Sequence, residues 1–391
     1  MTLDRIRLGY VPLTDAAPVL IAREMGFAAE EGLDLDLSRI GAWAQSRDLL
    51  GAGMIDAAHM LVPLPVAQAV GLGPDLPAMD LVMVLSQGGQ AVAISQTIAG
   101  RMRVDGHPFD FADARAAGAA LRRVVRGPLR VGVPFRFSTQ AELMFHWLEG
   151  CGFAVPEIRV VTVPPPMMAD AIAAGDVDAF CVGEPWCSFA VERGVATLLL
   201  PGRAIWAAPP EKGLVLRRDF TEARPDLTGR LMRAIWRAGR WLDEPENRGT
   251  AADILSRPEY LNLPPELAER GLRGRLMISA AGEVREDPDF IAFHRNGATF
   301  PWKSLAALFA ARMIRDHGLP AAPAMQAAMD CFRTDLHREH LRPAGAALPD
   351  ADIRTEGALP ASRPVTAERG QVILRADAFF DGRIFDPPSS T

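Results

Sequence analysis

The chain has 391 residues, which is enough for two domains that each bury a core of their own. Hydrophobic residues make up 49% and charged residues 23%, as in an ordinary soluble globular protein. The net charge of −6 argues against direct nucleic-acid binding, which needs a clustered basic face. No apolar run approaches the ~20 residues that a membrane-spanning helix requires.

The first part of the chain alternates strand and helix signals. An apolar strand leads into a loop where Thr14 or Asp15 is expected to cap a helix, and Gly26 ends that helix. Residues 33–37 then alternate like a strand with one wet face. The predicted elements are a strand at 5–11, a helix at 18–25, a strand at 33–39, a helix at 44–52 and a strand at 55–61.

The same order recurs about 120 residues later. The pattern Gly-x-hydrophobic-Asp-Ala occurs at 53–57 and again at 175–179, each time before an apolar strand and a helix opened by proline. The second copy ends a series of its own. The predicted elements of that series are a strand at 129–133, a helix at 139–149, a strand at 158–163, a helix at 165–174 and a strand at 177–182.

The repeat predicts two α/β lobes of like design. Ligands of open α/β sheets bind outside the carboxyl ends of the strands, so two such lobes facing each other would form a ligand cleft. This is the architecture of a solute-binding protein. We expect residues 1–95 plus 205–391 to form a discontinuous first lobe with C-terminal helices and a packed C-terminal strap, and 96–204 to form the second.

Several polar or aromatic residues fall at the predicted strand ends. Trp43 would either staple the following helix or roof a ligand in the cleft. Gly183 and Glu184 are expected to be exposed at the carboxyl end of their strand, with the Glu184 carboxylate near the positive end of the next helix. Thr139 opens a helix whose free amides favour an anion, although such hydroxyls commonly serve only as caps.

Two further positions lie at the predicted crossings between the lobes. Gln90 follows Gly88 and Gly89, which indicate either a flexible loop or a close approach of backbone to a ligand. Lys212 falls at the second crossing, on the hinge side of the cleft. Lys212 and Lys303 are the only lysines among many arginines, so we expect Lys212 to occupy a place where a guanidinium would not fit.

No catalytic or metal-binding pattern is evident. The seven histidines lack the paired spacing of a metal site, and no nucleophile elbow, phosphate-binding loop or dinucleotide glycine pattern occurs. The four cysteines have neither metal nor redox spacing, and Cys181 lies inside a predicted buried strand where a thiol is inert. The sequence therefore predicts a protein that is not an enzyme and has no cofactor or metal.

Eight motifs in order resemble the nitrate- and bicarbonate-binding branch of the type II solute-binding proteins that serve ABC importers. The resemblance covers most of the length and implies a two-lobed, periplasmic-binding-protein-like (type II) fold. The motifs are GYVPLTDAAP, GAWAQSRD, IDAAHML, VPPPMM, FCVGEPW, PPEKG, FPWKS and FFDGRIFDP.

The resemblance implies a site for a small oxyanion, nitrate or nitrite. Nitrate-binding members hold the anion with a Trp, a Gln, a His, backbone donors and a Lys, which match Trp43, Gln90 and Lys212 here. The family's His follows a Thr; in this chain Thr139 is followed by Gln140, which donates a hydrogen bond but carries no charge. Lys212 argues against bicarbonate, whose binders in this family replace the lysine and recruit a cation.

The residues before the first predicted strand show no leader peptide, so we expect a cytoplasmic protein. That location resembles the nitrate/nitrite sensors that sequester an RNA-binding antiterminator of the ANTAR type until the anion binds, and so control nitrate assimilation. Two alternatives are weighed against it. One is the exported substrate-binding subunit of a nitrate ABC importer. The other is an enzyme of the same fold, such as a thiamine-pyrimidine synthase or a desulfinase.

Overall fold

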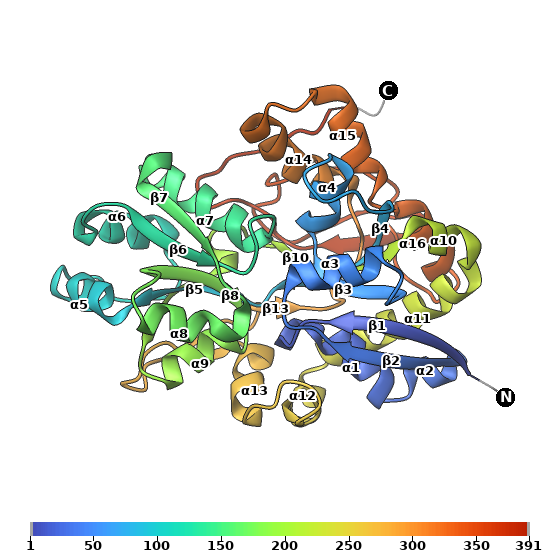
Figure 1. Cartoon of the computed structure of the whole chain (residues 1–391), viewed down its shortest axis with the longest axis horizontal. Helices are drawn as coiled ribbons and strands as arrows, with labels where there is room; N and C mark the ends of the chain where they lie inside the picture. The colour runs from blue at the N-terminus through green and yellow to red at the C-terminus, as the bar shows by residue number, and fades with distance from the viewer. Residues whose placement is uncertain (1–2, 389–391) are drawn as a thin grey trace.

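The computed structural model describes residues 3–388 and contains two mixed β-sheets with helices packed around them (Figure 1). The first sheet has six strands in the order β13-β4-β10-β3-β1-β2. Strands β2 and β3 run parallel to β1, whereas β10 is antiparallel to both of its neighbours. Its strands are β1 (Asp4–Tyr10), β2 (Leu33–Arg39), β3 (Ala57–Leu61), β4 (Met79–Gly88), β10 (Pro210–Arg217) and β13 (Ile291–Ala292).

The second sheet has five strands in the order β7-β6-β8-β5-β9. Strand β6 is parallel to β7 and β8, and β5 is antiparallel to β8 and β9. These strands are β5 (Gln90–Ser95), β6 (Leu129–Val133), β7 (Ile158–Thr162), β8 (Ala179–Gly183) and β9 (Ala196–Pro201). We call the six-stranded sheet with its helices the first lobe and the five-stranded sheet with its helices the second lobe.

The predicted internal repeat agrees with the strand order. In each sheet the first strand of the series lies between the second and the third, giving β2-β1-β3 in one lobe and β7-β6-β8 in the other. The connecting helices are α1 (Ala17–Glu24) with α2 (Phe27–Glu30), α3 (Trp43–Gly51), α7 (Thr139–Gly150) and α8 (Met168–Ala173). The α/β prediction is confirmed. Trp43, Thr139 and Gly183 end or follow strands of the two parallel triplets, whereas Gln90 and Lys212 lie on the antiparallel strands β5 and β10.

The chain passes from the first sheet to the second between β4 and β5. Gly88 and Gly89 both have positive φ, 73° and 87°, at this bend. A Cβ on Gly88 would lie 2.2 Å from the carbonyl oxygen of Phe290, so the close approach is to backbone of the same chain. Strand β5 therefore belongs to the second sheet, although the sequence placed residues up to 95 in the first lobe. The exact domain limits stay a prediction.

The remaining helices lie outside the two predicted series. Helices α5 and α6 lie between β5 and β6, and α10 to α16 lie after β10. The bounds are α4 (Pro63–Ala69), α5 (Gln96–Val104), α6 (Ala114–Val124), α9 (Trp186–Glu192), α10 (Arg218–Ala223), α11 (Pro225–Asp243), α12 (Arg248–Ser256), α13 (Pro265–Arg273), α14 (Lys303–His317), α15 (Ala321–Asp330) and α16 (Thr334–Leu341).

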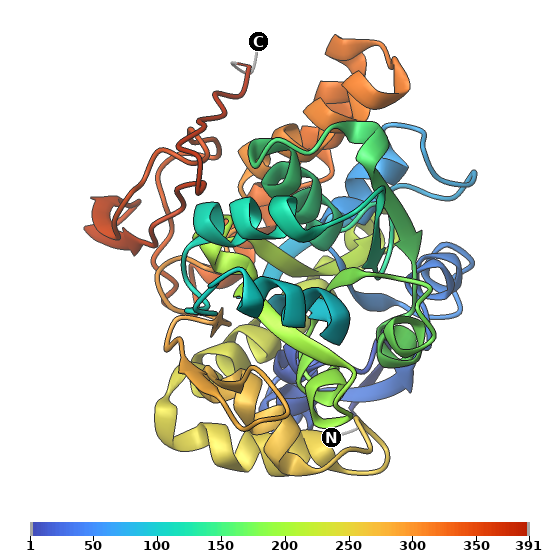
Figure 2. The ribbon, with the colours of Figure 1, turned by 90° about the vertical axis from the view of Figure 1, so that its left-hand side faces the viewer.

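Small β-elements and a C-terminal strap complete the fold. The hairpins are β11 (Arg275–Met277) with β12 (Val284–Glu286), and β14 (Arg363–Thr366) with β15 (Gln371–Leu374). After β15 the red C-terminal segment runs along one side of the molecule (Figure 2). Phe379 stacks on Trp206 with ring centroids 4.9 Å apart, which confirms the predicted packing of the strap.

Within residues 3–388, no helix is both long enough and apolar enough to cross a lipid bilayer.

Candidate functional site

Lys212 lies on β10, between β3 and β4, and its side chain has no solvent exposure. Its ammonium group donates a hydrogen bond to Asp15 Oδ2 at 2.8 Å and another to the carboxylate of Glu211. Both carboxylates are also buried. An ammonium cannot be removed from water without such partners, so this triad of charges is the electrostatic centre of the site.

Consecutive side chains meet here because β10 is irregular. Its register with β4 shifts on both sides of Lys212, between Pro210 and Lys212 and again between Lys212 and Gly213. In a regular strand, neighbouring residues point to opposite faces, whereas a bulge turns them toward the same side. The irregularity thus lets Glu211 and Lys212 share one buried cluster.

Asp15 holds the ammonium from the first lobe. Its Oδ1 accepts a hydrogen bond from His59 Nε2 at 3.0 Å while Oδ2 accepts from Lys212. The sequence assigned Thr14 or Asp15 to helix capping, and this was wrong: neither side chain caps the short helix at their position, and α1 has Ala16 at its N-cap. Instead, the Asp15 carboxylate pairs with the ammonium of Lys212, which is distant in the sequence.

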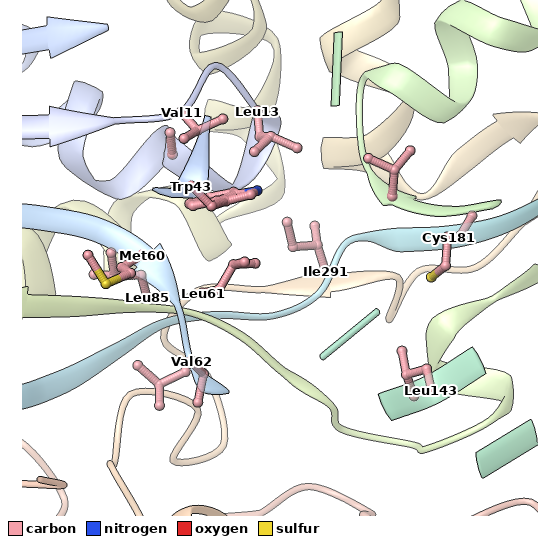
Figure 3. Close-up of a cluster of buried hydrophobic side chains, with 14 of the residues drawn as sticks. Val11, Leu13, Trp43, Met60, Leu61, Val62, Leu85, Leu143, Cys181 and Ile291 are labelled. Atoms are coloured by element: carbon pink, nitrogen blue, oxygen red, sulfur yellow. The ribbon is translucent and has the colours of Figure 1, made fainter. Parts of the chain in front are cut away.

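Trp43 covers the ammonium group. Its ring centroid lies 5.3 Å from Lys212 Nζ, within the range of a cation–π contact, and 5.7 Å from the His59 ring. Figure 3 shows Trp43 between the loop of Val11 and Leu13 and the strand of Leu61, with its indole nitrogen turned toward the side of Ile291. That nitrogen is buried without a hydrogen-bond partner. Trp43 is therefore both a packed residue and part of the charged centre.

The start of α7 brings the second lobe to the same point. Gln140 Nε2 donates to the Glu211 carboxylate, and Thr139 Oγ1 donates to the Pro210 carbonyl at 2.6 Å. The cap of this helix is Ser138, whose Oγ accepts from Ala141 N at 3.1 Å. Thr139 consequently ties α7 to β10 instead of capping the helix.

Gly183 and Glu184 follow the third strand of the second lobe. A Cβ on Gly183 would lie 2.9 Å from Leu13 Cδ2 and 3.3 Å from Asp15 Oδ2, so a side chain here would press on the first lobe. Gly183 and Glu184 were both predicted to be exposed, but both are buried, and Glu184 is only 1% exposed. Its Oε2 accepts from Ser188 N at 3.1 Å, and its carbonyl accepts from Thr14 N at 2.7 Å. Contact between the lobes is what buries it.

Gln90 lies opposite Gly183 in the second sheet and is fully buried. Both polar atoms of its side-chain amide lack a hydrogen-bond partner. A buried amide without partners lowers the stability of the fold. Its donor and acceptor atoms are therefore available to a bound ligand. The seven candidates from the sequence therefore lie on segments that meet at the crossing of the lobes; their roles in binding stay predictions.

Burial and pairing shift the acid–base behaviour of the cluster. Burial opposes the Lys212 charge, but Asp15 and Glu211 outweigh it and raise the pKa of the ammonium. Burial also works against the Asp15 charge, yet Lys212 and His59 lower the pKa of that carboxyl. For Glu211, burial prevails and raises the pKa to about 7. Burial lowers the pKa of His59, which is therefore neutral at physiological pH.

Sequence reasoning missed Asp15, His59 and Glu211 as members of the site. Glu211 directly precedes the lysine at the second crossing, and this position was the available signal. It was overlooked because neighbouring residues of a regular strand point to opposite faces. Across residues 3–388, no group of three or more His, Cys, Asp or Glu side chains could hold a metal ion. A cavity of about 250 Å³ lies elsewhere, between α7, α14 and the strap, and none of the seven candidates lines it.

Two α/β lobes joined by crossing strands are the architecture of the two-lobed solute-binding proteins. The chain belongs to the NMT1-like family, whose model matches residues 2–256.

Named relatives fit this class. The chain is 30% identical to the nitrate/nitrite binding protein NrtA of Nostoc sp. (strain PCC 7120), over 98% of this chain and 83% of NrtA. It is 28% identical to the bicarbonate-binding protein CmpA of Synechococcus elongatus, over 98% and 84% of the two chains. The crystal structure of the periplasmic nitrate-binding protein NrtA from Synechocystis PCC 6803 matches with a TM-score of 0.82 at 27% identity, over 98% and 96%.

Proposed function

We propose that the protein is a receptor for a small oxyanion, nitrate or nitrite, that closes its two lobes around the anion and serves an ABC importer. The observation that carries this proposal is the enclosed Lys212 ammonium, faced by Trp43 from the first lobe and by Gln140 of the second through Glu211. The proposed role is ligand binding and not catalysis, in keeping with relatives that are named as binding proteins.

The chemistry around Lys212 suits a planar oxyanion. The indole N–H of Trp43 and the amide N–H₂ of Gln90 are buried donors without partners. Together with the ammonium they provide hydrogen bonds of the charge-assisted kind, each contributing roughly 1.5–3 kcal/mol. Three such bonds support micromolar affinity after the entropy cost of binding is subtracted.

Nitrate calorimetry on matched lysine variants tests this function. At about pH 6, Lys212→Met should weaken nitrate binding at least about a hundredfold, because the ligand's charge loses its partner. Lys303→Met is the control: Lys303 is the other lysine of the chain, at the first turn of α14, and its loss should leave the affinity unchanged. Equal affinities for the two variants would contradict the proposal, and titrations with nitrite and bicarbonate rank the ligands.

The cytoplasmic sensor predicted from the sequence is the second proposal, with an ANTAR-type antiterminator as its partner. The relatives favour the importer receptor over it, since the matched NrtA from Synechocystis PCC 6803 is a periplasmic protein. Fractionation of cells that express the native gene separates the two locations. An antiterminator affinity that nitrate and nitrite leave unchanged would end the sensor hypothesis, because linkage requires the two ligands to affect each other equally.

A further inference from the structure

The charges around Lys212 do not balance for an anion. One ammonium faces two carboxylates, Asp15 and Glu211, and all three groups are buried. With both carboxylates ionised, the cluster carries one net negative charge before any ligand arrives. A bound monoanion would bring the enclosed charge to minus two, which low-dielectric surroundings strongly disfavour.

The other groups around the cluster do not supply the missing positive charge. His59 on β3 is neutral because burial lowers its pKa, and burial likewise keeps the Cys181 thiol on β8 protonated by raising its pKa. Gln140 on α7 is uncharged, and the Glu184 carboxyl is bonded to the start of α9. Asp15 reaches the cluster from the loop after β1. The remaining candidate for compensation is a proton on one of the carboxylates.

The hydrogen bonds point to Glu211 as the group that takes this proton. Both oxygens of Asp15 already accept hydrogen bonds, from His59 and from Lys212. On Glu211, Oε1 accepts from Lys212 and Gln140, but Oε2 is buried with no partner. A proton on Oε2 would relieve the charge and turn an unpartnered acceptor into a donor.

We propose that anion binding is linked to protonation of Glu211: the anion binds with one proton taken from solvent, and the Glu211 O–H donates to the bound anion. The inference rests on the proposed function and assigns a regulator, pH, to the same site. Burial raises the pKa of Glu211 to about 7, so the proton is already present in acid and must be taken up in base. The affinity for nitrate should be constant well below pH 7 and fall by about tenfold per pH unit above it.

Nitrate calorimetry on the full chain from about pH 5.5 to 8.5, in buffers that differ in ionisation enthalpy, tests the linkage. We expect uptake of about one proton per nitrate at pH 8 and of almost none at pH 5.5. Glu211→Gln should bind nitrate with an affinity that no longer depends on pH. The matched control is Glu142→Gln, because burial also raises the pKa of Glu142 to about 7, but this residue pairs with Arg312 at 2.7 Å. The pH dependence should persist in that control.

A measurement on the unmodified protein covers the case in which Glu211→Gln does not fold. An infrared difference spectrum at pH 8 should gain a protonated-carboxyl band when nitrate is added, and its absence would overturn the inference. A pH-independent affinity would do the same, as would a pH dependence that survives in Glu211→Gln. Affinity that requires Ca²⁺ and is lost to a chelator would identify a metal ion as the compensating charge instead. Absence of nitrate binding at every pH would overturn the proposed function itself.

Discussion

Two buried acidic clusters in the first lobe are balanced in different ways. Asp80 on β4 has no exposure, and its oxygens accept from Arg218 at 2.8 Å, Arg333 at 2.7 Å and Thr221 at 2.8 Å. Two cations, both reaching solvent, serve this one carboxylate. At the crossing of the lobes, one fully buried cation serves Asp15 and Glu211. Arg333 also pairs with Asp335, so the Asp80 cluster is balanced, whereas the Lys212 cluster has one more carboxylate than cation.

This difference separates a structural cluster from a binding one. The Asp80 cluster is completed by its own residues, and both oxygens of its carboxylate are paired. The Lys212 cluster leaves buried polar atoms unpaired on Trp43, Gln90 and Glu211. Folding alone does not satisfy those groups, so they gain partners only when something is added: a proton, an anion, or both. We therefore expect the stability of the protein and its nitrate affinity to depend on pH through the Lys212 cluster, and neither to depend on pH through the Asp80 cluster.

The largest effect on folding is expected from Lys212→Met. Removing the ammonium leaves Asp15 and Glu211 buried without a cation, so the pKa of each carboxyl rises above its value in the unfolded chain. A carboxyl whose pKa is higher in the folded than in the unfolded chain stabilises the fold at low pH, and this contribution is lost as the pH rises. Urea unfolding should show a loss of about 3–5 kcal/mol at pH 8 and a clearly smaller loss at pH 5. Equal losses at both pH values would show that charge is not the cause.

Asp80→Asn should have a smaller effect that is confined to stability. The substitution leaves Arg218 and Arg333 without their shared carboxylate, but both guanidinium groups are partly exposed, and water reduces the cost. We expect a loss of about 2 kcal/mol in urea unfolding and an unchanged nitrate affinity. A changed affinity or a changed pH dependence of binding would mean that the two clusters are coupled.

The sequence predicted the architecture better than it predicted the charges. The repeat and the position of Lys212 at a crossing follow from local patterns, because strands, helix ends and prolines are recognised within a few residues. Asp15 was misassigned as a cap because capping is also local, whereas its partner lies 197 positions away. Glu211 was overlooked because only the register shifts of β10 bring it beside Lys212. The pairing of β5 with β8 and β9 could not be predicted, because strand pairing is not encoded locally.

The smallest effect is expected from the removal of a single N–H group, that of the Trp43 indole. Trp43→Phe keeps an aromatic ring over Lys212 but removes the indole N–H, a donor that has no hydrogen-bond partner in the structure. Nitrate affinity should fall about tenfold, the equivalent of one charge-assisted hydrogen bond, while the free energy of unfolding changes by less than about 1 kcal/mol. Trp206→Phe is the matched control, because Trp206 also has a buried, unpartnered indole nitrogen but lines the cavity beside the strap. If both variants lost affinity equally, the donor of Trp43 would have no special place in the site, and its role would be packing alone.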